Sequence, residues 1–319
     1  MKTKNIQEKI YTDIQNQIVE MLENAKLTKT QKPWFGVGLE FANNPLSNTI
    51  YNGFNQFYLS LLCDFRGYKV NRWLTFKQIQ SLNGKVKKGS KACPVTYYQT
   101  FFKDAKGNKL SDIAVQELKK TTGKSLSELN ILSSAFVRFF YVFNVEQVAE
   151  LPQKYYDIDT VILNDVAKIE IAETVLINSN AKITNKLGDS AHYNLVDDEI
   201  TLPEIGQFTN SLDYYSVAFH ELSHWTGATS RLNRTFGKQF GNEDYAFEEL
   251  IAELSAALIC GSIQITRNFT NNATYIDSWL KVFKKDIKVF FKAAAHAQKA
   301  ADFILAFKES KQLAQKEAA

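Results

Sequence analysis

One stretch, Tyr214–Gly227, constrains the fold and chemistry of this chain more than any other. It reads YYSVAFHELSHWTG and carries His220, Glu221 and His224. Histidines four residues apart stand on the same face of a helix, one turn above the other. Two neutral imidazoles in this arrangement can share one tetrahedral metal ion, most commonly Zn²⁺. The carboxylate of Glu221 can take a proton from a water that the metal activates, so the stretch predicts part of a hydrolytic metal site.

A zinc hydrolase needs a third protein ligand and an open fourth position. One arrangement places a third histidine six residues after the second, but Ser230 occupies that position. The other takes a glutamate from a later helix, and Phe247–Cys260 (FEELIAELSAALIC) offers Glu249 and Glu253 one helical turn apart. Carboxylates on so apolar a helix must pair or bind a metal, because burying an isolated one is costly.

We assign Glu249 as the third ligand and Glu253 as the hydrogen-bond acceptor that fixes a histidine tautomer. The reverse assignment stays open, and Glu248 is an outside candidate for the ligand that we expect to face solvent instead. Mn²⁺ or Co²⁺ could replace Zn²⁺. His192 and the tyrosines near the motif, Tyr214, Tyr215 and Tyr245, are weaker expectations for stabilising an oxyanion.

Charge divides the chain into two parts. Residues 1–150 hold 21 Lys and Arg against 12 Asp and Glu, and residues 151–319 hold 17 against 22, so net charges of +9 and −5 sum to the overall +4. At 319 residues the chain is long for one hydrophobic core, and opposite charges indicate different partners. Because Pro152 interrupts the pattern, we expect domains over residues 1–150 and 151–319.

The basic excess lies beside aromatic residues. Asn83–Lys91 (NGKVKKGSK) opens with a turn dipeptide, and Pro94–Phe102 (PVTYYQTFF) predicts a strand paired with a second one over Ala135–Val145. Lysines that neutralise phosphates next to rings that stack on bases are what single-stranded DNA binding requires. The alternative is that the rings are core and the lysines a solvated hairpin. The expected DNA contacts are Lys85, Lys87, Lys88, Lys91, Arg72, Trp73, Tyr97 and Tyr98, with Arg66 as a further phosphate contact or a plain surface residue.

Other segments follow from periodicity and composition. Apolar residues every four positions predict an N-terminal helix over residues 6–22, and further helices are expected over Gln56–Phe65, Trp73–Ser81 and Ile162–Ile177. Lys106–Lys124 reads as a polar insertion. Residues 191–196 and 199–203 predict a strand pair, and the aromatic residues around 279–291 predict core helix.

Cysteine usage and the N-terminus bear on location. The three cysteines are far apart, odd in number and without CxxC spacing, which favours free thiols in a reducing compartment. The N-terminus has no apolar segment of the kind found in signal peptides, and no apolar run approaches the length of a membrane span. We therefore expect a cytoplasmic protein with no membrane contact.

Together these motifs resemble the ArdC-type antirestriction proteins of plasmids and conjugative elements. FHELSHWTGATSRLNR and YAFEELIAELSAAL carry the resemblance in the second half, and YNGFN, W-x-TF, KVKKGSKACPV and FFYVFNVEQV carry it in the first. The resemblance implies an α+β fold, with an N-terminal single-stranded-DNA-binding domain followed by a zincin-like metallopeptidase domain. It also implies a role in helping incoming mobile DNA survive host restriction.

The sequence therefore predicts an antirestriction protein that binds single-stranded DNA and carries a zinc metallopeptidase site acting on a peptide or protein. In one alternative, this is a DNA-binding protective protein whose metal site is structural or regulatory. In another, it is a peptidase that cleaves one host protein and uses DNA only for recruitment. The peptide substrate, DNA sequence preference and oligomeric state stay open.

Overall fold

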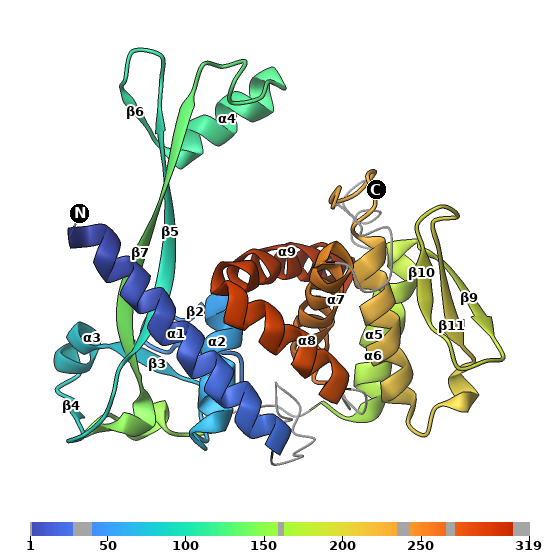
Figure 1. Ribbon diagram of the computed structural model, residues 1–319, viewed down its shortest axis with the longest axis horizontal. Helices are drawn as coiled ribbons and strands as arrows, with labels where there is room; N and C mark the ends of the chain where they lie inside the picture. Colours follow the sequence, from blue (N-terminus) through green and yellow to red (C-terminus); the bar gives the residue numbers. More distant parts are fainter. Residues whose placement is uncertain (1, 28–39, 159–162, 235–242, 266–271, 309–319) are drawn as a thin grey trace, which may run out of the picture.

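The computed structural model describes residues 2–27, 40–158, 163–234, 243–265 and 272–308. The described chain mixes helices with small sheets, so the predicted α+β class is confirmed. Figure 1 shows a four-stranded sheet with its helices at one end, a central group of helices, and a three-stranded sheet with two helices at the other end. None of the described helices is long and apolar enough to cross a membrane.

The first half begins with helix α1 (Lys2–Leu27), which confirms the N-terminal helix. Its four-residue period buries Ile10, Ile14, Ile18 and Leu22 against the rest of the molecule. Helix α2 (Gly53–Phe65) is also confirmed. The short elements around it are β1 (Asn43–Asn44), β2 (Thr49–Ile50), α3 (Phe76–Ser81), β4 (Lys85–Val86) and β8 (Val148–Ala149).

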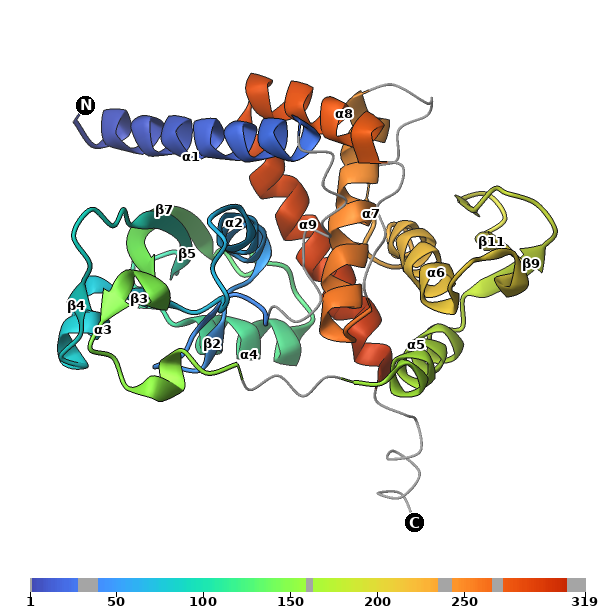
Figure 2. The same cartoon turned by 90° about the horizontal axis from the view of Figure 1, so that it is seen from below.

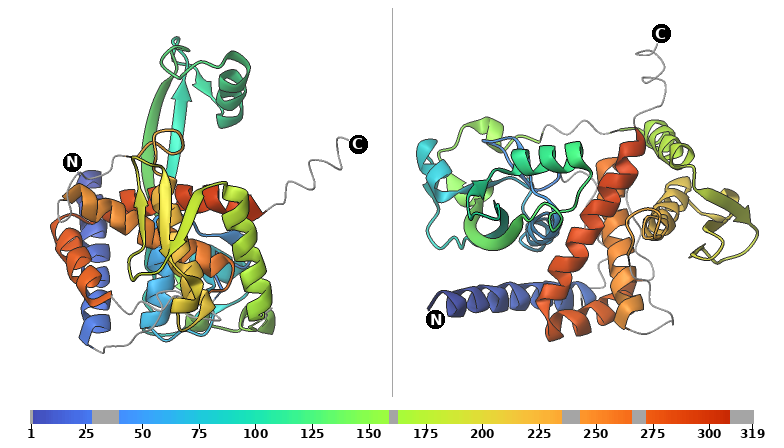
Figure 3. Two further views of the ribbon diagram at one scale, coloured as in Figure 1. Left: turned by 90° about the vertical axis from the view of Figure 1, so that its right-hand side faces the viewer. Right: turned by 90° about the horizontal axis from the view of Figure 1, so that it is seen from above.

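The sheet of the first half is antiparallel with order β3-β7-β5-β6. Its strands are β3 (Trp73–Thr75), β5 (Cys93–Lys103), β6 (Lys109–Leu110) and β7 (Leu132–Asn144). The predicted pairing of the two long strands is confirmed, since β5 runs beside β7 from Cys93 opposite Val142 to Lys103 opposite Leu132. The far end of this pair projects from the body as a twisted ribbon, with α4 (Asp112–Thr122) at its tip (Figures 1 and 3).

One expectation for this half is wrong in detail. The helix predicted from Trp73 begins only at Phe76, because Thr75 caps it and residues 73–75 pair with β7 instead. The polar insertion Lys106–Lys124 contains helix α4, which is capped by Ser111 at its start and by Gly123 in the left-handed conformation at its end.

The second half contains α5 (Asp165–Ser179), β9 (Lys182–Lys186), β10 (His192–Asn194), β11 (Glu199–Pro203), α6 (Ser211–Trp225), α7 (Glu243–Ser262), α8 (Asn272–Lys285) and α9 (Ile287–Leu305). Short 3₁₀ turns lie at Val145–Gln147, Gln153–Tyr155, Ile205–Gln207 and Ala306–Lys308. The predicted β10–β11 hairpin is confirmed, and β9 adds parallel to β11, leaving β10 at an edge.

One hydrophobic core connects the two halves. The ring of Phe54 in α2 stacks on Phe291 in α9 with centroids 3.7 Å apart. The backbone amide of Gly53 donates to Gln298 Oε1 at 2.9 Å, and Gln15 in α1 donates to the carbonyl of Phe283 at 2.7 Å. Figure 2 shows α1 lying beside α8 and α9. The domain boundary near residue 150 stays a prediction.

Candidate metal centre and nucleic-acid interface

The HExxH segment forms the second half of α6. Asn210 caps the start of this helix by accepting a hydrogen bond from the backbone amide of Leu212. As the four-residue spacing predicts, His220 and His224 lie on one face, with their Nε2 atoms 3.2 Å apart. Helix α7 packs against this face and carries the acids that meet the histidines.

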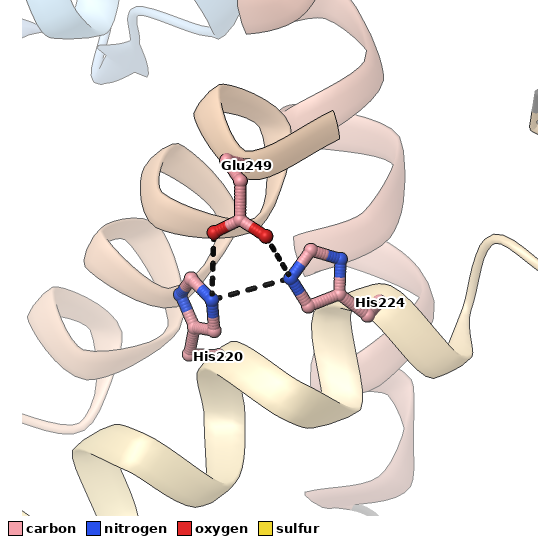
Figure 4. Close-up of side chains that lie close together, drawn as sticks. All are labelled: His220, His224 and Glu249. Atoms are coloured by element: carbon pink, nitrogen blue, oxygen red, sulfur yellow. Dashed lines mark hydrogen bonds and ion pairs between the residues drawn. The ribbon is translucent and has the colours of Figure 1, made fainter. Parts of the chain in front are cut away.

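Glu249 lies between the two histidines (Figure 4). One of its carboxylate oxygens is 3.5 Å from His220 Nε2 and the other is 3.4 Å from His224 Nε2. Ligand atoms of these three residues all lie within 4.8 Å of one another. The side chains of His220, His224 and Glu249 are 13%, 11% and 11% exposed, so the cluster is largely buried.

Each histidine also meets a second carboxylate from α7 on its other ring nitrogen. Glu253 lies 3.1 Å from His220 Nδ1, where an acceptor that fixes the tautomer is expected. Glu248 lies 3.3 Å from His224 Nδ1 and is 3% exposed, so the expectation that it faces solvent is wrong. The charge of Glu248 is matched by Arg234, whose guanidinium donates to both carboxylate oxygens at 2.6 and 3.0 Å.

Arg234 was not singled out from the sequence, although it is a buried part of this cluster. Besides Glu248, it donates to the carbonyl of Ser223 at 2.7 Å and to the hydroxyl of Thr226 at 2.8 Å. Ser223 lies in the last turn of α6, and Thr226 caps its end. Arg234 therefore ties the helix that carries the histidines to the helix that carries the glutamates.

The carboxylates control protonation of the imidazoles. Burial lowers the pKa of His220, but Glu253 and Glu249 more than offset this and raise that pKa above the ordinary histidine value. The pKa of His224 is raised in the same way by Glu248 and Glu249. Burial raises the pKa of Glu249, but hydrogen bonds from both histidines reverse this and hold its pKa below the usual range. Glu249 is thus a carboxylate at neutral pH.

This donor set fits a divalent metal ion. Two imidazole nitrogens and one carboxylate converge from two helices, as in the zinc sites of hydrolases. Each histidine has a carboxylate behind its other nitrogen, which is the usual support of a metal-binding imidazole. The two Nε2 atoms lie 3.2 Å apart, and each faces an oxygen of Glu249, so all three donor groups point toward one position. His220, His224 and Glu249 are the residues that would hold the ion.

Glu221 is buried beside the cluster, at 6% exposed. Its carboxylate makes no hydrogen bond or ion pair with any residue the structure describes, yet its charge acts on both imidazoles. The hydroxyls of Tyr214 and Tyr215, considered as oxyanion donors, are engaged elsewhere with Asn185 and Glu173.

The residues expected to bind DNA separate into exposed and buried groups. Lys85, Lys87, Lys88 and Lys91 are all exposed, and Tyr97 is 54% exposed on the ribbon. Trp73 is completely buried, with its indole bonded to Asn71, so its predicted stacking on bases is wrong.

Arg72, Tyr98 and Lys85 complete the set of expected DNA contacts. The Arg72 side chain is 12% exposed and pairs with Glu40, and its expected phosphate contact stays a prediction. The side chain of Tyr98 lies outside the described residues, although its backbone pairs with Val137. Lys85 is exposed, but its amino group forms an ion pair with Glu150 at 3.0 Å.

Two family models match the chain. Residues 8–143 match the N-terminal domain of the anti-restriction factor ArdC, and residues 170–296 match a zincin-like metallopeptidase domain. The first match covers the sheet with the lysine turn, and the second covers both helices of the histidine–glutamate cluster.

Individual relatives extend the match to nearly the whole chain. The chain is 35% identical over 298 residues to a DNA primase TraC of Escherichia coli and 30% identical to the protein y4eC of Sinorhizobium fredii. It covers 91% of y4eC, but it spans only 20% and 28% of the length of two TraC relatives.

Two solved structures also match nearly the whole chain. The metal-free crystal structure of the antirestriction ArdC protein from plasmid R388 matches with a TM-score of 0.69 and 30% identity, covering 93% of this chain and 97% of that one. The Mn(II)-bound structure of the same protein matches with a TM-score of 0.69 and 28% identity, covering 94% of this chain and 98% of that one.

Proposed function

The chain belongs to the ArdC antirestriction family, and from this premise we propose that it binds single-stranded DNA of a mobile element and carries a metallopeptidase site. We propose that the DNA-binding domain and the metallopeptidase domain meet near residue 150. The three cysteines are buried free thiols, which suits the reducing cytoplasm in which such DNA would be protected.

The observation that carries the enzymatic part is the convergence of His220, His224 and Glu249, each held by a helix and backed by further carboxylates. Bound Zn²⁺, Mn²⁺ or Co²⁺ would supply a Lewis acid and lower the pKa of a water. Zn²⁺ is the ion that two imidazoles and one carboxylate suit best. The R388 protein crystallised with Mn(II) makes manganese the second choice.

Glu221 is the proposed general base. It has no competing partner among the described residues, so its carboxylate is free to take a proton from an attacking water. The same carboxyl group can return that proton to the leaving amine of a cleaved peptide. The edge strand β10 beside α6 offers unpaired backbone to which an extended peptide could add.

DNA binding is proposed for the first half of the chain. Its basic surface includes four exposed lysines within seven residues, and Tyr97 presents a ring that a base could stack on. The net charge of +9 over residues 1–150 favours any polyanion, and the exposed ring favours a strand whose bases are accessible.

The metal assignment is tested by metal analysis of purified variants. His220→Ala and Glu249→Gln should lose stoichiometric metal, while Glu221→Gln should keep it and lose peptide hydrolysis. Retention of stoichiometric metal by His220→Ala would show that the ligand assignment is wrong.

The alternative function is a DNA-binding protective protein whose metal site is structural or regulatory. The bonds that tie α6 to α7 through Arg234 favour it, because a metal at this point would also hold the two helices together. In that case Glu221→Gln would leave protection of transferred DNA intact. Charge reversal at Lys87 and Lys88 would abolish it. Loss of protection in Glu221→Gln with unchanged DNA affinity would instead indicate cleavage of a host protein.

A further inference from the structure

A basic hollow lies where the lysine turn meets the end of α2. Its volume is about 500 Å³, within the range of sites that bind small ligands. Its lining includes five charged residues, which are Arg66, Lys87, Lys88, Lys91 and Glu146. Four of these side chains are cationic and one is acidic, so the hollow favours an anion.

The single acid in the lining does not cancel this charge. One oxygen of Glu146 already accepts hydrogen bonds from the backbone amides of Lys69 and Val70 at 2.5 and 3.1 Å. Lys87 turns its amino group to the backbone carbonyl of Glu146 at 2.8 Å rather than to a carboxylate. Lys88 and Lys91 have no hydrogen-bond or ion-pair partner for their amino groups anywhere in the described chain.

Arg66 is held in place at the edge of the hollow. Its guanidinium donates to the carbonyl of Lys91 at 3.4 Å and also bonds to Tyr68, which leaves donors of the guanidinium fork unused. The lysines are held by a tight turn, in which the backbone amide of Ser90 donates to the carbonyl of Lys87 and Gly89 takes a φ of +85°. The turn itself is anchored by the backbone amide of Lys87, which donates to the carbonyl of Gln147.

We propose that this hollow binds phosphodiester groups of single-stranded DNA, with Arg66 giving the directed contact and Lys88 and Lys91 the added charge. A planar fork suits the paired oxygens of a phosphate, whereas lysines act as point charges. A second hollow, which Arg66 and Lys91 also line, is smaller, about 270 Å³, and its lining includes Glu20. An anion therefore prefers the hollow to which Lys87 and Lys88 add their charge. This inference rests on the proposed DNA binding and gives it a location.

The test is fluorescence anisotropy with a 3′-labelled oligothymidylate that has a 5′-hydroxyl, measured over a series of salt concentrations. Lys88→Gln/Lys91→Gln removes two exposed cations that hold nothing in the fold. We expect its affinity to fall about tenfold or more, because two cations that neutralise phosphates are removed. The slope of log affinity against log salt should become shallower by about 0.7 for each phosphate that the variant no longer neutralises. Arg66→Gln should lower the affinity for single-stranded DNA in the same way. Arg66→Lys should bind more tightly than Arg66→Gln, because it keeps the charge.

The matched control is Lys281→Gln/Lys292→Gln, which removes the same charge from exposed positions on α8 and α9. Equal losses of affinity in the control and in Lys88→Gln/Lys91→Gln would overturn the proposed role of the hollow. The proposal that the chain binds single-stranded DNA would still stand. A wild-type protein that binds no single-stranded DNA would overturn the proposed function itself.

The same titrations with a 5′-phosphorylated oligonucleotide, and with inorganic phosphate as competitor, distinguish the source of the phosphate. A loss of affinity seen only with the 5′-phosphorylated strand, or full competition by inorganic phosphate, would mean that the hollow binds a terminal phosphate and would overturn the phosphodiester assignment. Equal losses with both strands support it.

Discussion

Replacing Glu248 with glutamine tests how a residue that only contacts a metal-binding histidine supports the candidate metal site. The three proposed ligands themselves stay unchanged. The substitution keeps the size of the side chain but removes the charge that neutralises Arg234 and faces His224. Arg234 and Glu248 are 9% and 3% exposed, so the arginine would be left buried without a counter-charge. Removing one partner of a buried ion pair costs about 3–5 kcal/mol of unfolding free energy. We expect a destabilisation of this size in the metal-free protein.

Metal affinity should fall as well, for a different reason. Glutamine leaves only an uncharged, weaker acceptor behind His224, and changing such a supporting residue typically lowers metal affinity about 10- to 100-fold. Replacing both charges, as Arg234→Met with Glu248→Leu, should restore most of the stability, because an apolar pair of similar volume often substitutes for a buried ion pair. A residual cost of about 1 kcal/mol is expected, since the bonds to Ser223 and Thr226 are also removed. Metal affinity should stay low.

Stability is measured by urea unfolding of the metal-free protein, and affinity by competition with a chromophoric chelator for Zn²⁺ and Mn²⁺. Asp198→Asn is the matched control, because Asp198 forms a similar two-oxygen pair with Arg231 that contacts neither histidine of the cluster. The metal affinity of Asp198→Asn should equal that of the wild-type protein. Wild-type metal affinity in Glu248→Gln would refute the argument and leave Glu248 with a role in folding alone.

Three other predictions follow. Metal affinity should fall as the pH is lowered from about 9, because the carboxylates raise the pKa of His220 and His224 and a metal can bind only when it displaces their protons. Calorimetry in buffers of different ionisation enthalpy measures the number of protons released. Tyr97→Ala should weaken single-stranded DNA binding by about 1–3 kcal/mol, whereas Trp73→Phe should lower the melting temperature and leave affinity unchanged. Gly84→Ala should destabilise the protein by about 1–3 kcal/mol in urea unfolding, because its new methyl carbon would lie 2.7 Å from Leu151, while Gly206→Ala, which faces open space, should not.

Local periodicity predicted the elements whose pattern is complete within one segment. The four-residue repeat of α1 and the histidine spacing on α6 each define one face of a helix, and both faces are the buried ones. The prediction for Trp73 failed because three residues cannot distinguish a strand from the first turn of a helix. The pairing of these residues with β7, about 70 residues away in sequence, decided the outcome.

Polar segments were the second source of error. Strand β9 has the sequence KITNK, which carries no alternation, and it exists because β11 offers it a partner in parallel register. Helix α4 was overlooked because its surroundings are charged, although Ser111 and Gly123 are cap residues that could have been read from the sequence. Composition described the polarity of this insertion but not its structure.

The reversed expectation for Glu248 shows what helical periodicity leaves undetermined. Successive residues of a helix point about 100° apart, so Glu248 and Glu249 cannot both face the same ion. Periodicity alone therefore assigned Glu248 to solvent. The packing of α6 on α7 sets Glu249 between the two histidines, so carboxylates on both flanks, Glu248 and Glu253, each reach an outer imidazole nitrogen. A buried carboxylate there needs a cation to stay charged, and Arg234 supplies it from a loop that no helical period could link to α7.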